Sequence, residues 1–241
     1  MTPLLAVLGG ALWGVLAGAL VPRAAYRLSV PPEESRRRAC PEGHPLGGWL
    51  GLARCGADGE WYGPRTATLA AATAVVCAAL AAATGARPEL GAWLLLAPVG
   101  VLLAVVDFRV HRLPDVVTLP LAGAALALLG GAALLPEHAG EWTGALYGAF
   151  ALAGAYFVLF LVNPGGMGFG DVKLALALGA VLGWYGWGVL LLGTFAGFVL
   201  ASLYGIGLVA ARRAGRRTAI PFGPFLIGGA FVGVLLGAYS A

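Results

Sequence analysis

Residues 90–106 read LGAWLLLAPVGVLLAVV, an uncharged apolar run that ends at Asp107. Such a run is typical of a helix that crosses a bilayer, which needs about 20 predominantly apolar residues. Similar runs cover residues 4–22, 66–84, 116–135, 142–162, 172–187, 188–210 and 220–239. The sequence therefore predicts an all-α polytopic membrane bundle of about eight transmembrane helices.

The composition excludes an ordinary soluble domain. The mean hydropathy is +0.87 and charged residues make up 11% of the chain, against about 25% in soluble domains. The apolar runs are continuous, whereas the strands of a membrane barrel would alternate, so helices are favoured. No charged linker separates 172–187 from 188–210, and that boundary is predicted from Gly183, Gly186 and Gly188. The first run lacks a basic leading segment and is interpreted as a retained helix.

The basic residues predict the orientation, because Lys and Arg are biased to the cytoplasmic side. With the N-terminus outside, all of the 15 Lys and Arg except Arg87 fall on the inner side. These residues are Arg23, Arg27, Arg36, Arg37, Arg38, Arg54, Arg65, Arg109, Arg112, Lys173, Arg212, Arg213, Arg216 and Arg217. The net charge of +4 then reflects topology near anionic lipid and requires no nucleic-acid partner.

Three segments are expected along the chain. Residues 1–22 form the first transmembrane helix, residues 23–65 a polar cytoplasmic loop, and residues 66–241 the main membrane domain. The 39 Gly favour close helix packing through small residues. The three cysteines, Cys40, Cys55 and Cys77, do not make a disulfide framework.

The segment 107–115, DFRVHRLPD, places Asp107 at the C-terminal end of a helix, near the cytoplasmic rim. A carboxylate there faces the negative end of the helix dipole. An ionisable group at a membrane rim is costly, so Asp107 is a candidate functional residue. Asp115 is expected to cap the next helix. The other polar residues of the segment are interpreted as topology and loop residues: Arg109, His111 and Arg112.

The segment 163–173, NPGGMGFGDVK, is a glycine-rich turn before another helix. Its glycines are expected to allow backbone conformations and close approaches that side chains forbid: Gly165, Gly166, Gly168 and Gly170. The ordinary interpretation makes Asp171 an N-cap and Lys173 a surface charge. No strand precedes the turn, so a phosphate-binding loop is excluded.

Together, Asp107 and Asp171 suggest a carboxylate pair of the aspartic protease kind. Two carboxylates that share one proton can activate a water molecule and protonate a leaving amine. Asp171, at a helix N-terminus, is expected to stay ionised, and Asp107, at a C-terminus, to hold the proton. The two groups would titrate as a unit.

These motifs resemble those of the type IV prepilin leader peptidases, a family of GxGD intramembrane-type aspartic peptidases. GFGDVKLALALG at 168–179 is similar to the GxGD motif, and DFRVHRLPDVVTLPL at 107–121 to the first aspartate segment. IPFGPFLIGGA at 220–230 is similar to a C-terminal signature of the family, and GALVPRAAYRLS at 18–29 is a looser match.

The resemblance implies a hydrolase of the cell inner membrane with its active site at the cytoplasmic face. Its partners would be membrane lipid and the prepilins or pseudopilins of a type IV pilus or protein secretion system, cut after a glycine. The implied catalytic residues are Asp107 and Asp171. Residues implied to bind substrate or support the motif are Gly168, Gly170, Asp115 and Lys173. No metal or cofactor is implied for proteolysis.

One departure from the family lies in the loop 23–65. The family carries two CxxC pairs there, which accompany zinc binding and N-methylation, but here each pair has lost a cysteine. Four residues could still offer zinc ligands: Cys40, His44, Cys55 and Asp58. Because structural zinc sites keep regular ligand spacing, the expected reading is a reduced remnant of the methyltransferase region, without zinc and without methylation.

Two alternatives to a peptidase remain open from the residues. A transporter would use Asp107 and Asp171 as proton or cation carriers, although transport sites usually lie near the bilayer midplane on broken helices. A non-catalytic scaffold for pilus assembly would have no need to keep both aspartates.

Overall fold

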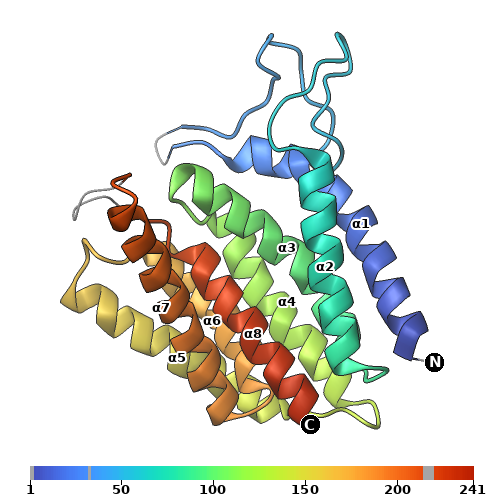
Figure 1. Ribbon diagram of the computed structural model, residues 1–241, viewed down its shortest axis with the longest axis vertical. Coiled ribbons are helices and arrows are strands. Elements are labelled where there is room, and N and C mark those ends of the chain that lie inside the picture. The colour runs from blue at the N-terminus through green and yellow to red at the C-terminus, as the bar shows by residue number, and fades with distance from the viewer. Residues whose placement is uncertain (1–2, 32–33, 214–219) are drawn as a thin grey trace. The chain divides into compact units, whose positions relative to one another are not determined.

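The computed structural model describes residues 3–31, 34–213 and 220–241, which contain eight α-helices (Figure 1). The helices are α1 (Pro3–Leu28), α2 (Thr66–Thr84), α3 (Glu89–Val110), α4 (Asp115–Ala133), α5 (Trp142–Val162), α6 (Phe169–Gly183), α7 (Trp187–Ala210) and α8 (Gly223–Ser240). Within the described ranges the only β-pairing is two isolated bridges, Ala39 with Pro45 and Arg54 with Trp61. The predicted all-α class is confirmed.

Seven of the eight helices are long and apolar enough to cross a membrane, and α6 is the exception. Its 15 residues reach about 22 Å, less than the hydrocarbon core of about 30 Å. The predicted break between α6 and α7 is confirmed, but α6 already ends at Gly183 and α7 begins at Trp187. Gly186 between them has φ of +98°. A glycine adopts that conformation without the steric cost that a side chain would bring.

Helix α1 continues to Leu28, beyond the apolar run 4–22 predicted from the sequence. Figure 1 shows α1 bending near its C-terminal end, where Pro22 lies inside the helix. Proline lacks an N–H and commonly bends a helix. Beside the bend, the Arg23 N–H donates to the Gly51 carbonyl (3.1 Å) and the Gly51 N–H donates to the Leu20 carbonyl (2.9 Å). The loop therefore begins after the helix has turned.

The chain divides into two compact units, Met1–Pro114 and Asp115–Ala241. The first unit holds α1, α2, α3 and the loop 29–65, and the second holds α4 to α8. In the second unit α6 packs against α4, α5, α7 and α8, and most of its residues are buried. This enclosure explains how a short helix can be part of a membrane bundle.

Two earlier expectations are not decided by this structure. The functional division into 1–22, 23–65 and 66–241 stays a prediction. The orientation with the N-terminus outside also stays a prediction, and two of its supporting residues, Arg216 and Arg217, lie outside the described residues.

Glycines bring helix backbones into contact, which confirms the predicted close packing. A Cβ added to Gly148 of α5 would lie 2.5 Å from the Gly179 carbonyl oxygen of α6. A Cβ on Gly14 of α1 would lie 2.6 Å from the Cα of Ala74 on α2. Such small residues allow the close approach that drives helix association in membranes.

We expect Gly148→Ala to destabilise the second unit by about 1–3 kcal/mol, because the new methyl group forces α5 and α6 apart. The matched control is Gly154→Ala on the same helix, where an added Cβ meets nothing within 4 Å. The control should be neutral or stabilising by up to about 1 kcal/mol, through helix propensity. Thermal unfolding in detergent measures both, and equal midpoints for the two variants would contradict the packing argument.

Candidate active site

Asp107 lies in the last turn of α3, which ends at Val110. Its side chain is buried, with 5% exposure. His111 follows in the left-handed conformation, and its N–H donates to the Asp107 carbonyl oxygen (2.8 Å). The predicted position at a helix C-terminus and the exposed position of His111 are both confirmed. The carboxyl is therefore enclosed by protein at the end of the helix that carries the negative dipole.

Asp171 is the third residue of α6, because the helix begins at Phe169 with Gly168 as its N-cap. The interpretation of Asp171 as the N-cap itself is therefore wrong. Its Oδ2 accepts the Gly168 N–H at 3.1 Å, and the side chain is 7% exposed. A carboxylate at this place satisfies a backbone donor of the first turn and lies at the positive end of the helix.

The glycine-rich turn before α6 is less unusual in its backbone than expected. None of its four glycines has a positive φ, so the expectation of a conformation reserved for glycine is wrong. A close approach is present at one position, because a Cβ on Gly166 would overlap the side chain of Asn163. At Gly168 an added Cβ would make only ordinary contact, 3.4 Å from Asp171 Oδ2.

Lys173 and Asp115 form an ion pair, with 2.7 Å between Nζ and Oδ2. Asp115 is the first residue of α4, and Lys173 lies in α6, where its Nζ is also 4.9 Å from the centre of the Phe169 ring. The interpretation of Asp115 as the N-cap is wrong, because the helix already includes it. The surface-charge interpretation of Lys173 omits its ion pair. The pair ties the start of α4 to the start of α6, two residues from Asp171. It supports the turn that carries the carboxylate.

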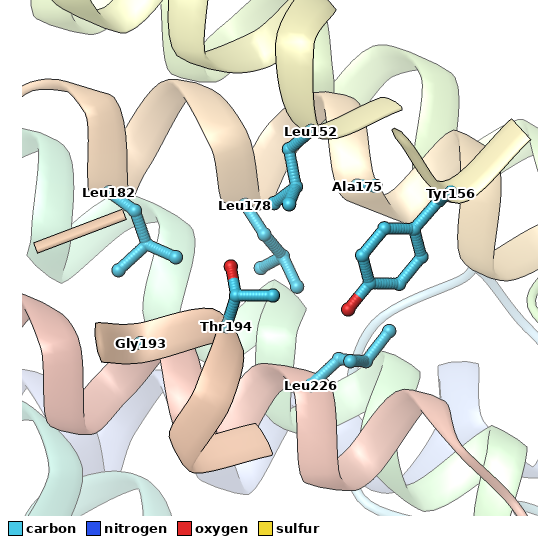
Figure 2. Close-up of a pocket in the computed structure, with 8 residues that line it drawn as sticks. All are labelled: Leu152, Tyr156, Ala175, Leu178, Leu182, Gly193, Thr194 and Leu226. Atoms are coloured by element: carbon cyan, nitrogen blue, oxygen red, sulfur yellow. The ribbon is translucent and has the colours of Figure 1, made fainter. Parts of the chain in front are cut away.

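A small cavity of about 10 Å³ lies within the second unit (Figure 2). Its lining residues are Leu152, Tyr156, Ala175, Leu178, Leu182, Gly193, Thr194 and Leu226. Ala175 is one helical turn from Asp171, and the Tyr156 ring extends into the pocket. Thr194 is one of the two lining residues with a polar side chain, and its hydroxyl already donates to the Leu190 carbonyl oxygen (2.7 Å). The cavity is therefore mostly apolar in its lining and no larger than about one water molecule.

Four residues of the loop 29–65 bring potential metal ligands together. The ligand atoms of Cys40, His44, Cys55 and Asp58 all lie within 4.8 Å of one another. The two Sγ atoms are 3.6 Å apart, and His44 Nδ1 is 3.6 Å from Cys40 Sγ and 3.4 Å from Cys55 Sγ. His44 Nδ1 is also 3.1 Å from Asp58 Oδ2.

The three separations among Cys40, His44 and Cys55 match a tetrahedral zinc ion, and the His44–Asp58 separation of 3.1 Å is slightly shorter. Bonds of about 2.3 Å to sulfur and about 2.0 Å to nitrogen or oxygen place tetrahedral ligand atoms about 3.3–3.8 Å apart. The irregular spacing of neighbouring ligands in the sequence suggested a decayed site. In the structure, each turn contributes two ligands and the two turns face each other.

Local hydrogen bonds prepare two of these groups for a cation. Burial would raise the pKa of the Cys40 thiol, but hydrogen bonds from the His44 backbone and from Cys55 lower it below its ordinary value. The Glu60 N–H donates to Asp58 and lowers the pKa of that carboxyl. The pKa of His44 is raised by its hydrogen bond to Cys40, so a metal ion would displace that proton.

The loop has a small core of its own that includes part of α1. Tyr26 at the end of α1 packs with Ala53 and Tyr62, and the buried Cys40 and Cys55 belong to the same cluster. The rings of Tyr26 and Tyr62 have centroids 4.7 Å apart. The candidate metal ligands are thus held by packing to a transmembrane helix.

Arg23 and Arg27 have a structural role that the sequence did not reveal. Arg23 donates to the carbonyl oxygens of Gly47 and Leu52, the latter at 3.1 Å, and Arg27 donates to the Gly48 carbonyl oxygen at 2.7 Å. The bias of Lys and Arg to the cytoplasmic side is enough to explain both charges, so it does not indicate these hydrogen-bond partners. Their spacing of four positions on one helix face was the available signal.

Comparison with known proteins identifies the family. A profile of the Type IV leader peptidase family matches residues 94–206. A protein named prepilin leader peptidase/N-methyltransferase from Aeromonas hydrophila is 34% identical over 225 residues, which cover 88% of this chain and 74% of that protein. One of the same name from Pseudomonas aeruginosa is 31% identical over 233 residues, covering 89% and 75%. No solved structure matches the chain.

The chain therefore belongs to the Type IV leader peptidase family. The resemblance inferred from the motifs is confirmed, and the protein is a multi-pass membrane protein of a peptidase family. The matched segment contains Asp107, Asp115 and Asp171. The catalytic assignment of individual residues stays a prediction.

We expect Asp115→Asn and Lys173→Met each to lower the rate of leader cleavage by up to about fivefold, because a partly exposed ion pair contributes about 0–1 kcal/mol. The double variant should cleave no more slowly than the slower of the two single variants, since each change removes the same interaction. Cleavage of a model prepilin measures the cycle. A loss of several hundredfold in Lys173→Met alone would show that Lys173 acts in the chemistry itself.

Proposed function

We propose that this protein is an aspartic endopeptidase that removes the leader peptides of type IV prepilins or pseudopilins, cutting after a glycine at the cytoplasmic face of the inner membrane. Family membership and the names of its relatives support the activity and the substrate class. The side assigned to the active site rests on the segregation of Lys and Arg along the sequence.

In this proposal Asp171 takes the proton of the attacking water, and Asp107 donates a hydrogen bond to the scissile carbonyl. The supporting observation is that both side chains are buried at helix ends of opposite polarity. The Gly168 N–H bonded to Asp171 favours a carboxylate there. The C-terminal end of α3 favours a protonated Asp107. Two carboxyl groups with such different environments are suited to divided acid and base roles.

The transporter alternative has no matching observation. The chain belongs to a peptidase family, and the pocket one turn from Asp171 has a mostly apolar lining. A membrane path for protons or cations would need polar groups along it. Leader cleavage therefore explains the carboxylates better than transport does.

We also propose that Cys40, His44, Cys55 and Asp58 hold one zinc ion with a structural role. The supporting observation is the match between their separations and a tetrahedral ligand set. The ion would join the two turns of the loop and would take no part in peptide hydrolysis. The relatives' names include N-methyltransferase, but we propose cleavage alone for this chain, because the loop has only two cysteines.

We expect Asp107→Asn and Asp171→Asn each to reduce cleavage of a model prepilin by a factor of about 10² to 10⁴, as the loss of a general acid or base does. Glu137→Gln, which alters an exposed carboxylate outside both the proposed dyad and the candidate metal cluster, is the control and should keep far more activity. The measurement uses purified protein in detergent without an ion gradient. Substantial activity in either dyad variant would exclude the two-carboxylate mechanism.

Zinc is expected at about one ion per chain in protein purified without chelator, since four ligand atoms converge on one site. Cys40→Ser should lose most of it. Cys77→Ser is the matched control, because Cys77 is buried within α2, away from the loop. Elemental analysis measures the zinc content of each variant. Equal zinc in the two variants, or no zinc in the parent, would contradict the proposed site and support the remnant predicted from the sequence spacing.

A further inference from the structure

Exposed apolar side chains gather in residues 46–52, LGGWLGL, within the loop 29–65. Trp49 is 42% exposed, Leu50 61% and Leu52 44%. Single exposed apolar side chains are common on protein surfaces, but three within four positions form a patch that normally marks an interaction site. We call these three residues the tryptophan patch.

Hydrogen bonds hold the tryptophan patch in place. Gly51, between its two leucines, exchanges backbone hydrogen bonds with Arg23 and Leu20 of α1. The Arg23 guanidinium donates to the Leu52 carbonyl oxygen at 3.1 Å. These bonds fix the patch against the bent end of α1.

The same bonds set the level of the tryptophan patch relative to the membrane. Helix α1 is a candidate span, and Leu16 and Leu20 on it are 57% and 46% exposed, as side chains that face lipid would be. Because the Gly51 N–H bonds to the Leu20 carbonyl, Leu50 and Leu52 lie beside the last apolar turn of α1 before its arginines begin. We take that level as the boundary between hydrocarbon and headgroups, because the arginines that follow favour the water side of a span.

Positive charge surrounds the aromatic ring of the patch. The Arg27 guanidinium lies 4.5 Å from the centre of the Trp49 ring and that of Arg36 lies 5.3 Å from it. Tryptophan is enriched at membrane interfaces, and juxtamembrane arginines are attracted to anionic lipid by about 1 kcal/mol each. An apolar patch edged by cations complements a surface with acyl chains below and phosphates above.

We propose that the tryptophan patch inserts into the headgroup region of the leaflet at this end of α1, with Arg27 and Arg36 directed at anionic lipid phosphates. The patch then anchors the loop to the membrane surface between its two ligand-bearing turns. The candidate metal cluster is thereby kept at a fixed height above the bilayer, independently of whether the cluster holds an ion.

The test uses the full-length protein in nanodiscs that contain phosphatidylglycerol, with tryptophan fluorescence as the readout. The Trp49 signal is the difference between the parent and Trp49→Phe, after equal thermal midpoints have confirmed that both are folded. We expect lipid brominated near the headgroups to quench most of this signal and aqueous acrylamide to quench little of it. Leu50→Ser combined with Leu52→Ser should reduce the lipid quenching and raise the acrylamide quenching.

Two results would overturn the proposal. Trp49 quenched by acrylamide and not by brominated lipid would face water. Trp49 protected from both quenchers would be covered by protein, either another part of the chain or a second copy. Replacing phosphatidylglycerol with phosphatidylcholine tests how much the anionic lipid contributes to insertion of Trp49. If the quenching of Trp49 by brominated lipid does not change, the role given to Arg27 and Arg36 is excluded.

Discussion

The contact between α5 and α6 is the constraint on which the second unit depends. Gly148 and Gly179 bring the two backbones so close that a methyl group on either would collide with a carbonyl oxygen of the other helix. Only this approach lets α6, too short to span a bilayer alone, be enclosed by its neighbours. Because α6 is enclosed, its N-terminus and Asp171 are held in place by the surrounding helices.

The helices themselves could be predicted well from the sequence, because a bilayer accepts little besides continuous apolar helices. The limits of 66–84 and 142–162 match α2 and α5 to the residue. The end of α1 was missed because a hydropathy criterion stops where arginines begin. Arg23 is nevertheless still in the helix, since its side chain and its N–H find acceptors in the loop.

Only part of the candidate site could be predicted from the sequence. Asp107 and Asp171 stood out because carboxylates are costly at a membrane rim, and the structure confirms their places at helix ends. The N-cap interpretation of Asp171 was wrong because Gly168, three residues earlier, is the N-cap. The ion pair between Lys173 and Asp115 joins positions 58 residues apart, and no local pattern indicates which distant charge a side chain will meet.

The loop shows why spacing is a weak guide to a metal site once its pattern is irregular. Regular spacing predicts ligands because a short turn fixes where two side chains point, but any pair of turns held face to face achieves the same result. Here Ala39 pairs with Pro45 and Arg54 with Trp61, so each ligand-bearing turn is closed by a bridge. Tyr26 and Tyr62 then pack the turns onto α1. The arrangement of the four candidate ligands therefore rests on this core and on the bonds from Arg23 and Arg27, rather than on the ligands alone.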